Sequence, residues 1–237
     1  MRKCQCDGGM RMNLGFLRTC RPTGWTGLAG AILFLATTLS VSGQTGIHRP
    51  VEFVIGGEPG APIKIEVFSD YQCPACRTFY LDTIKPILAN YASAKTSPNG
   101  QPIKPRVCVV YHDLPLDIHP FARPAARLGL AAQRLGRERW LRVSDALYTH
   151  QAQWSQDGNL DAALAKVLDP TEVVRLRKLA ADPAIDALVD QELMLAQSRE
   201  VTSTPTFFII TETGRQQRVN GPVPYAVMKD FLDRLLK

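Results

Sequence analysis

The sequence has little excess charge outside its N-terminal segment. The formal net charge of the 237 residues is +6, and residues 1–43 contribute +4 of it, with five basic side chains against one acid. The remaining +2 is too small for the electrostatic footprint of a nucleic-acid-binding protein, so a nucleic-acid partner is excluded. Hydrophobic residues make up 45% and charged residues 21%, which argues against a disordered chain and against a multi-span membrane protein.

Cysteine is scarce in the part of the chain that we expect to fold. Three of the six cysteines precede an apolar run at 28–41, namely Cys4, Cys6 and Cys20. The three that follow the run are Cys73, Cys76 and Cys108. One close pair and one spare thiol do not make a disulfide scaffold, so we expect the pair to serve chemistry. No histidine or second cysteine pair accompanies the N-terminal CQC, which we interpret as incidental and not as a metal site.

The first 43 residues have the pattern of an export signal. Arginines precede the run LAGAILFLATTLSV at 28–41, and small residues follow it through Gly43. A basic segment, a short apolar segment and a small-residue end are typical of a signal peptide, cut here before Gln44. An uncleaved membrane anchor is the alternative, although the run is short for a full span. Either way, we expect an exported, periplasmic or extracytoplasmic protein.

The hydrophobic pattern predicts an α/β core that helices interrupt once. Alternating or β-branched runs predict five strands, at 51–55, 63–68, 106–111, 206–211 and 216–219. Helical spacing of apolar residues follows Cys73 through Tyr91, fills the stretch from about Pro120 to Arg199, and returns after Pro224. The polar residues at 95–105 predict a loop. We therefore expect a sheet domain formed by residues 50–116 and 200–237, with an inserted all-helical subdomain at 117–199.

The sequence Cys73-Pro74-Ala75-Cys76 stands where a predicted strand gives way to a predicted helix. Residues three apart share a helix face, so the two sulfurs can come within bonding reach. Free N–H groups and the helix dipole favour a thiolate at Cys73, and Cys76 lies one turn inside, where it would resolve a mixed disulfide. Half a zinc site or a purely structural pair is the alternative. No second cysteine pair follows the apolar run, and the change from strand to helix is the context that a redox motif needs, so redox chemistry is favoured.

Three segments resemble the DsbA-like branch of the thioredoxin superfamily. They are FSDYQCPACRTFY at 68–80, YHDLPLDIHPFARPAARLGLAA at 111–132, and STPTFFI at 203–209. The resemblance implies a thioredoxin-like mixed sheet flanked by helices, with a helical insertion. It implies that Pro205 is a cis-proline facing the cysteines and that Thr204 offers backbone groups to an extended substrate. An ordinary trans proline in a loop is the alternative for Pro205.

The resemblance also bears on Glu66, since family members often keep a buried acid on this strand that moves protons to and from the inner thiol. Glu66 could equally be a solvated strand residue. We expect Asp70 to be structural and Cys108 to be an inert buried thiol. His112 and His119 invite a metal hypothesis, but capping or packing is favoured, so we expect no metal and no cofactor.

These features predict a thiol–disulfide oxidoreductase that exchanges a Cys73–Cys76 disulfide with the thiols of exported proteins. Export to a compartment that permits disulfides favours net oxidation, with a membrane or soluble redox partner restoring the active form. A dedicated reductase for one client and a thiol-based copper metallochaperone are the alternatives. Thr204 before the proline also occurs in isomerase-like relatives, but those carry an N-terminal dimerisation domain, for which the stretch between Gln44 and Val51 is too short. We expect a monomer.

Overall fold

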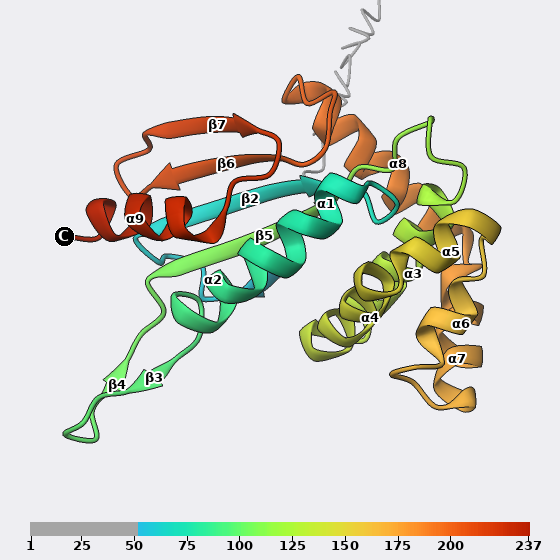
Figure 1. Cartoon of the computed structure of the whole chain (residues 1–237), viewed down its shortest axis with the longest axis horizontal. Coiled ribbons are helices and arrows are strands. Elements are labelled where there is room, and N and C mark those ends of the chain that lie inside the picture. Colours follow the sequence, from blue (N-terminus) through green and yellow to red (C-terminus); the bar gives the residue numbers. More distant parts are fainter. Residues whose placement is uncertain (1–51) are drawn as a thin grey trace, which may run out of the picture. The chain divides into compact units, whose positions relative to one another are not determined.

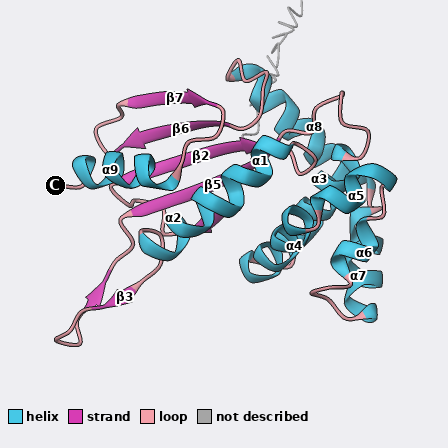
Figure 2. Ribbon diagram, in the orientation of Figure 1, coloured by secondary structure: helices cyan, strands magenta, loops and turns pink. Residues whose placement is uncertain are grey.

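The structure is a computed structural model that describes residues 52–237 (Figures 1 and 2). The export segment predicted at 1–43 lies outside the described residues. The described residues belong to one compact unit. The separate helical subdomain expected at 117–199 stays a prediction. Within the described residues, no helix has the length and apolarity needed to cross a bilayer.

A five-stranded sheet forms the centre of this unit, with the strand order β1-β5-β2-β6-β7. The strands are β1 (Val54–Gly56), β2 (Ile63–Ser69), β5 (Val107–Asp113), β6 (Thr206–Thr211) and β7 (Gln216–Asn220). β2 pairs with β5 in parallel, from Ile63 opposite Val107 to Ser69 opposite Asp113, and the other three pairings are antiparallel. The sheet is therefore mixed, as the resemblance implied, and β2 is its central strand.

Alternation along β2 sends its side chains to two different hydrophobic clusters. Ile65 and Val67 pack in the larger cluster with Cys76, and Phe68 packs in a smaller one with Phe208 and Ala196. Helices α1 (Pro74–Phe79) and α9 (Tyr225–Leu235) lie on the first face (Figure 1). There Phe79 of α1 stacks on Phe207, and Met228 of α9 joins the cluster. Helix α8 (Pro183–Ser198), which contains Ala196, lies on the second face of the sheet. We call these two sides of the sheet the α1 face and the α8 face.

The helix predicted after Cys73 has three parts: α1 (Pro74–Phe79), the π-helical turn η1 (Tyr80–Ile84) and α2 (Lys85–Asn90). The backbone N–H of Lys85 donates to the carbonyl of Tyr80, five residues back. The next residue, Pro86, has no N–H to donate and its ring crowds the preceding turn, which accounts for the wider spacing. The helix continues through this widened turn.

Six helices fill the stretch between β5 and β6, which we call the helical insertion. They are α3 (Ala122–Arg134), α4 (Arg137–Thr149), α5 (Gln151–Asp157), α6 (Leu160–Leu164), α7 (Pro170–Ala180) and α8 (Pro183–Ser198). Asp169 caps α7 in a reciprocal capping box with Glu172, and Asp182 caps α8. Both caps precede a proline at the first helical position, as the sequence predicts.

The polar stretch at 95–105 is not only loop. It contains a short antiparallel pair, β3 (Lys95–Thr96) and β4 (Pro102–Ile103), so the prediction of a loop was wrong there. The turn between them is closed by the Ser97 N–H, which donates to the Gln101 carbonyl at 2.8 Å. All four strand residues are exposed. Because none of these four residues is buried, the alternation of apolar and polar residues could not predict this pair of strands.

Candidate active site

Cys73 is the N-cap of α1, at the carboxyl end of β2. Its backbone is extended, with φ −72° and ψ 121°, and its carbonyl accepts the first helical hydrogen bond, from the Arg77 N–H at 3.1 Å. Pro74 occupies the first helical position, where its missing N–H costs nothing. The strand thus delivers the sulfur of Cys73 directly to the positive end of a helix.

The two sulfurs have different environments. Cys73 is 8% exposed, while Cys76, one turn deeper, is fully buried. A hydrogen bond from Cys76 lowers the pKa of Cys73 to about 5, against the opposing effect of burial, with further help from the N–H groups of Cys76 and Ala75. Burial raises the pKa of Cys76 well above its ordinary value, and the nearby Cys73 adds to the rise. At neutral pH the outer sulfur is therefore a thiolate and the inner sulfur a thiol.

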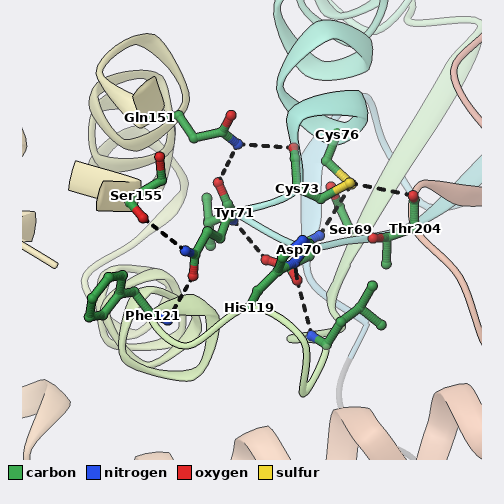
Figure 3. A network of polar contacts seen from close by, with 12 residues as sticks. Ser69, Asp70, Tyr71, Cys73, Cys76, His119, Phe121, Gln151, Ser155 and Thr204 are labelled. Carbon is green, nitrogen blue, oxygen red and sulfur yellow. Dashed lines mark hydrogen bonds and ion pairs between the residues drawn. The ribbon is translucent and has the colours of Figure 1, made fainter. Parts of the chain in front are cut away.

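The Thr204–Pro205 peptide bond is cis, and it lies beside the outer sulfur. The carbonyl oxygen of Thr204 is 3.5 Å from the Sγ of Cys73 (Figure 3). Thr204 is half-buried and Pro205 is buried. The structure therefore brings together two segments that are more than 130 residues apart in the sequence.

Two glutamines attach the loop before Cys73 to the helical insertion (Figure 3). The Nε2 of Gln151, on α5, donates to the carbonyls of Tyr71 and Cys73 at 2.7 and 2.9 Å. Gln72 accepts from the Phe121 N–H at 2.7 Å and donates to the Ser155 carbonyl at 3.2 Å. The role of Gln151 could not be predicted from the sequence, because a lone glutamine on a helix carries no signal of a contact 78 residues away.

Asp70 organises the turn between β2 and the cysteines. Its backbone N–H donates to the Sγ of Cys76 at 3.4 Å. Its buried carboxylate accepts from the N–H groups of Gln72 and Leu116, at 2.7 and 3.0 Å, and lies 2.6 Å from the Nδ1 of His119. Asp70 and His119 thus hold the loop after β5 against the loop before α1, in agreement with the structural role expected for both.

Glu66 lies on the opposite side of the sheet from Cys73 and Cys76. Its side chain lies on the α8 face, where its carboxylate contacts Lys64 at 2.6 Å and Arg199 at 2.9 Å. Glu66 is only 3% exposed, so the alternative of a solvated strand residue was wrong. Burial raises its pKa, but the hydrogen bond and charge of Lys64 and the charge of Arg199 outweigh it, so the net pKa is lowered. A charged carboxylate across the sheet from Cys76 gives no geometric support to a proton relay.

Neither Cys108 nor His112 belongs to the site. Cys108 is buried on β5, and burial raises the pKa of its thiol. His112 stacks on Phe68 and lies 2.8 Å from the Oε2 of Glu192 on α8. Within residues 52–237, no group of three or more potential ligands could hold a metal ion.

A row of buried hydroxyls starts at Ser69, the last residue of β2. Ser69 and Tyr148 share a hydrogen bond of 2.8 Å, and Tyr148 shares one of 2.6 Å with Tyr111. Tyr148 lies on α4, in the helical insertion. The ring of Tyr148 is buried, and its hydroxyl hydrogen-bonds to Ser69 at the end of β2.

Comparisons with known proteins agree with this geometry. A family model described as thioredoxin matches residues 50–234. A search of curated proteins gives no match. Among solved structures, DsbA2 of Pseudomonas aeruginosa is 27% identical, with a TM-score of 0.58 over 78% of this chain and 95% of that chain.

Two further structures share the fold at lower identity. The α-DsbA1 protein of Wolbachia pipientis is 19% identical, with a TM-score of 0.60 over 78% of this chain and 91% of that chain. Oxidised BdbD of Bacillus subtilis is 18% identical, with a TM-score of 0.59 over 78% and 92%. The chain belongs to the thioredoxin family, with a DsbA-like fold, and is a thiol–disulfide oxidoreductase.

Proposed function

We propose that this enzyme is an extracytoplasmic dithiol oxidase that takes electrons from the thiols of exported proteins into a Cys73–Cys76 disulfide. The observation that supports this direction is the lowered pKa of Cys73, about 5. A stabilised thiolate is a good leaving group and stabilises the reduced enzyme, so the disulfide becomes more oxidising. Relatives with a nucleophile pKa of about 3.5 are strong oxidants, whereas thioredoxin, at about 7, is reducing.

The reaction has two exchange steps at Cys73. A client thiolate attacks the Cys73 sulfur, a client–Cys73 bond forms, and Cys76 leaves with the electron pair of the broken disulfide. A second client thiolate then attacks the client's own sulfur, and Cys73 leaves as a thiolate. Two electrons have moved from the client to the enzyme. A membrane or soluble redox partner would remove them and restore the disulfide.

Client binding is assigned to the backbone around Thr204 and Pro205. Thr204 lies beside the sulfur that is attacked, so an extended client segment there would present its own sulfur to Cys73. Pro74 and Ala75 shape the first turn that holds the pair. Export is supported by the pattern at 1–43, with residues 28–43 as the anchor if the segment is not cut. We propose that the protein acts as a monomer.

The reduction potential in a glutathione redox buffer tests the direction. We expect a value on the oxidising side of the range, closer to about −120 mV than to about −270 mV. Cys108→Ala is the matched control and should leave the potential unchanged, because Cys108 is buried on the α8 face. A value near −270 mV would support a dedicated reductase. Copper bound tightly through dialysis, without any disulfide exchange, would support the metallochaperone.

A further inference from the structure

One residue is hydrogen-bonded to both cysteines of the pair. The backbone N–H of Asp70 donates to the Sγ of Cys76 at 3.4 Å (Figure 3). The backbone carbonyl of Asp70 accepts from the N–H of Cys73 at 3.1 Å. Burial raises the pKa of Cys76 most, and the Asp70 N–H opposes this rise. The inner sulfur therefore has a fixed backbone donor beside it.

The peptide group that carries this N–H is also held at its other side. The peptide group between Ser69 and Asp70 is planar, so the Ser69 carbonyl and the Asp70 N–H point in opposite directions. The Ser69 carbonyl accepts from the N–H of Leu114 at 2.8 Å. Hydrogen bonds in a chain polarise one another, so this bond strengthens the Asp70 N–H as a donor. The peptide group thus connects Cys76 to the first residue after β5.

The buried carboxylate of Asp70 fixes the same residue from another direction. It accepts from the N–H groups of Gln72 and Leu116, at 2.7 and 3.0 Å, and the Nδ1 of His119 lies 2.6 Å from its Oδ2. A carboxylate only accepts hydrogen bonds, so the Nδ1 of His119 carries the hydrogen. The other two donors are backbone groups. His119 is therefore the donor to Asp70 that a substitution can remove.

We propose that the backbone N–H of Asp70 is a catalytic group that stabilises negative charge on Cys76, and that His119 is the positioning residue that holds Asp70 in place. The inference rests on the proposed dithiol–disulfide exchange. When a client thiolate attacks Cys73, a client–Cys73 bond forms, the Cys73–Cys76 bond breaks, and its electron pair goes to Cys76. The client's proton has already passed to solvent. The new thiolate accepts the hydrogen bond from Asp70, which is stronger in this buried site than in water, and then takes up a proton from solvent.

Two amide side chains separate the donor of His119 from the bulk of its ring. The side-chain nitrogen of asparagine can take the place of Nδ1, whereas the longer side chain of glutamine carries its nitrogen to the place of Nε2. His119→Asn therefore keeps the donor to Asp70, and His119→Gln moves it away. Asp117 is exposed on the same loop, so Asp117→Ala is the matched control for a change in this segment.

The experiment follows Cys76 directly. Reduced protein is mixed rapidly with excess oxidised glutathione, which forms a mixed disulfide at Cys73. Acid quenching and mass spectrometry then time the release of glutathione by Cys76 at neutral pH. We expect His119→Ala and His119→Gln to slow this release about tenfold, because a hydrogen bond to a charge weakens when its donor moves out of line. His119→Asn should restore the rate, and Asp117→Ala should leave it unchanged.

The titration of the Cys73 thiolate separates this role from a general loss of structure. Its midpoint should not move in His119→Gln, because the groups that lower the pKa of Cys73 belong to α1 and Thr204. A shifted midpoint would overturn the inference, as would release at the wild-type rate in His119→Gln or slow release in His119→Asn.

The comparison of His119→Asn with His119→Gln decides the matter even if His119→Ala fails to fold, since both amides keep a polar side chain at this position. If the wild-type protein itself fails to exchange with glutathione, the proposed function falls as well. Normal exchange with unaffected variants removes this inference alone.

Discussion

The two faces of the central sheet hold buried polar groups of opposite character. On the α1 face, which holds Cys76, the buried hydroxyls of Ser69, Tyr148 and Tyr111 form a hydrogen-bonded row. On the α8 face, Glu66 forms ion pairs with Lys64 and Arg199. On the α1 face, the hydrogen bond from Cys76 and the N–H groups at the start of α1 lower the pKa of Cys73. The Glu66–Arg199 ion pair ties β2 to the end of α8, from which the chain continues to Thr204 and Pro205. The α1 face therefore contains the reactive cysteines, and the α8 face contains the ion pairs that stabilise the surrounding fold.

The largest expected effect separates the cysteines of the two faces. Cys76→Ala should abolish turnover and hold clients as mixed disulfides through Cys73, because the resolving sulfur is gone. Cys108→Ala, on the α8 face, should trap nothing and exchange at the wild-type rate. Non-reducing electrophoresis followed by mass spectrometry measures the trapped species. Equal trapping by both variants would remove the distinction between the faces.

A pH series sharpens the comparison on the α1 face. The pKa of Cys73 is lowered to about 5 in the folded protein, against about 8.5 for an ordinary thiol. A lowered pKa contributes stability that is complete above the unfolded value and is lost as pH falls through the folded value. Between these limits, the free energy of unfolding of the reduced protein should rise by up to about 1.4 kcal/mol per pH unit.

Denaturant unfolding at several pH values measures this rise, with the oxidised protein as the control because it has no thiolate. The difference between the reduced and oxidised proteins should grow from pH 5 toward pH 8.5. A difference that stays constant across this window would mean that Cys73 is not stabilised as an anion.

A third variant tests the framework role of the α8 face. Arg199→Ala removes the ion pair with Glu66 and the guanidinium that lies 4.3 Å from the ring centre of Phe208. We expect a loss of about 1.5–3 kcal/mol in the free energy of unfolding, because a hydrogen bond to a buried charge is lost. The titration of Cys73 should not move.

Arg123→Ala is the matched control, since its ion pairs with Asp186 and Asp190 are exposed and should contribute at most about 1 kcal/mol. Chemical denaturation of the oxidised proteins gives both values. A shifted Cys73 titration in Arg199→Ala would show that the two faces are not independent.

The smallest effect concerns the attachment of the active-site loop to the helical insertion. Gln151→Ala removes the donor to the carbonyls of Tyr71 and Cys73, while Cys73 keeps its bond from the Arg77 N–H. We expect a loss of about 1–2 kcal/mol in the free energy of unfolding, together with slower exchange. Gln153→Ala, an exposed neighbour on α5, should change neither quantity. Equal effects of the two substitutions would contradict the role of Gln151.

Local signals were sufficient to predict much of the fold and the reactive pair. Alternation and helical spacing placed the five main strands and the helical stretches within a few residues. The change of period at Cys73 placed the cysteines at the start of a helix. The cis geometry of Pro205 came from the family resemblance, because the sequence around it also suits a trans proline.

The contacts that surround the inner sulfur could not be predicted in this way. Alternation along β2 places Glu66 and Ile65 on opposite faces, but it does not say which face α1 covers. Gln151 and Tyr148 reach the site from positions more than 70 residues away, so no local pattern reports them.

The titration of the reduced protein tests the central claim most directly. The ultraviolet absorbance of the thiolate is followed from pH 3 to 10, with Cys73→Ser as the blank. We predict a transition with a midpoint near 5 that is absent from the blank, while Cys76 stays protonated to well above its ordinary range. A single transition near the ordinary thiol value of about 8.5 would contradict the account.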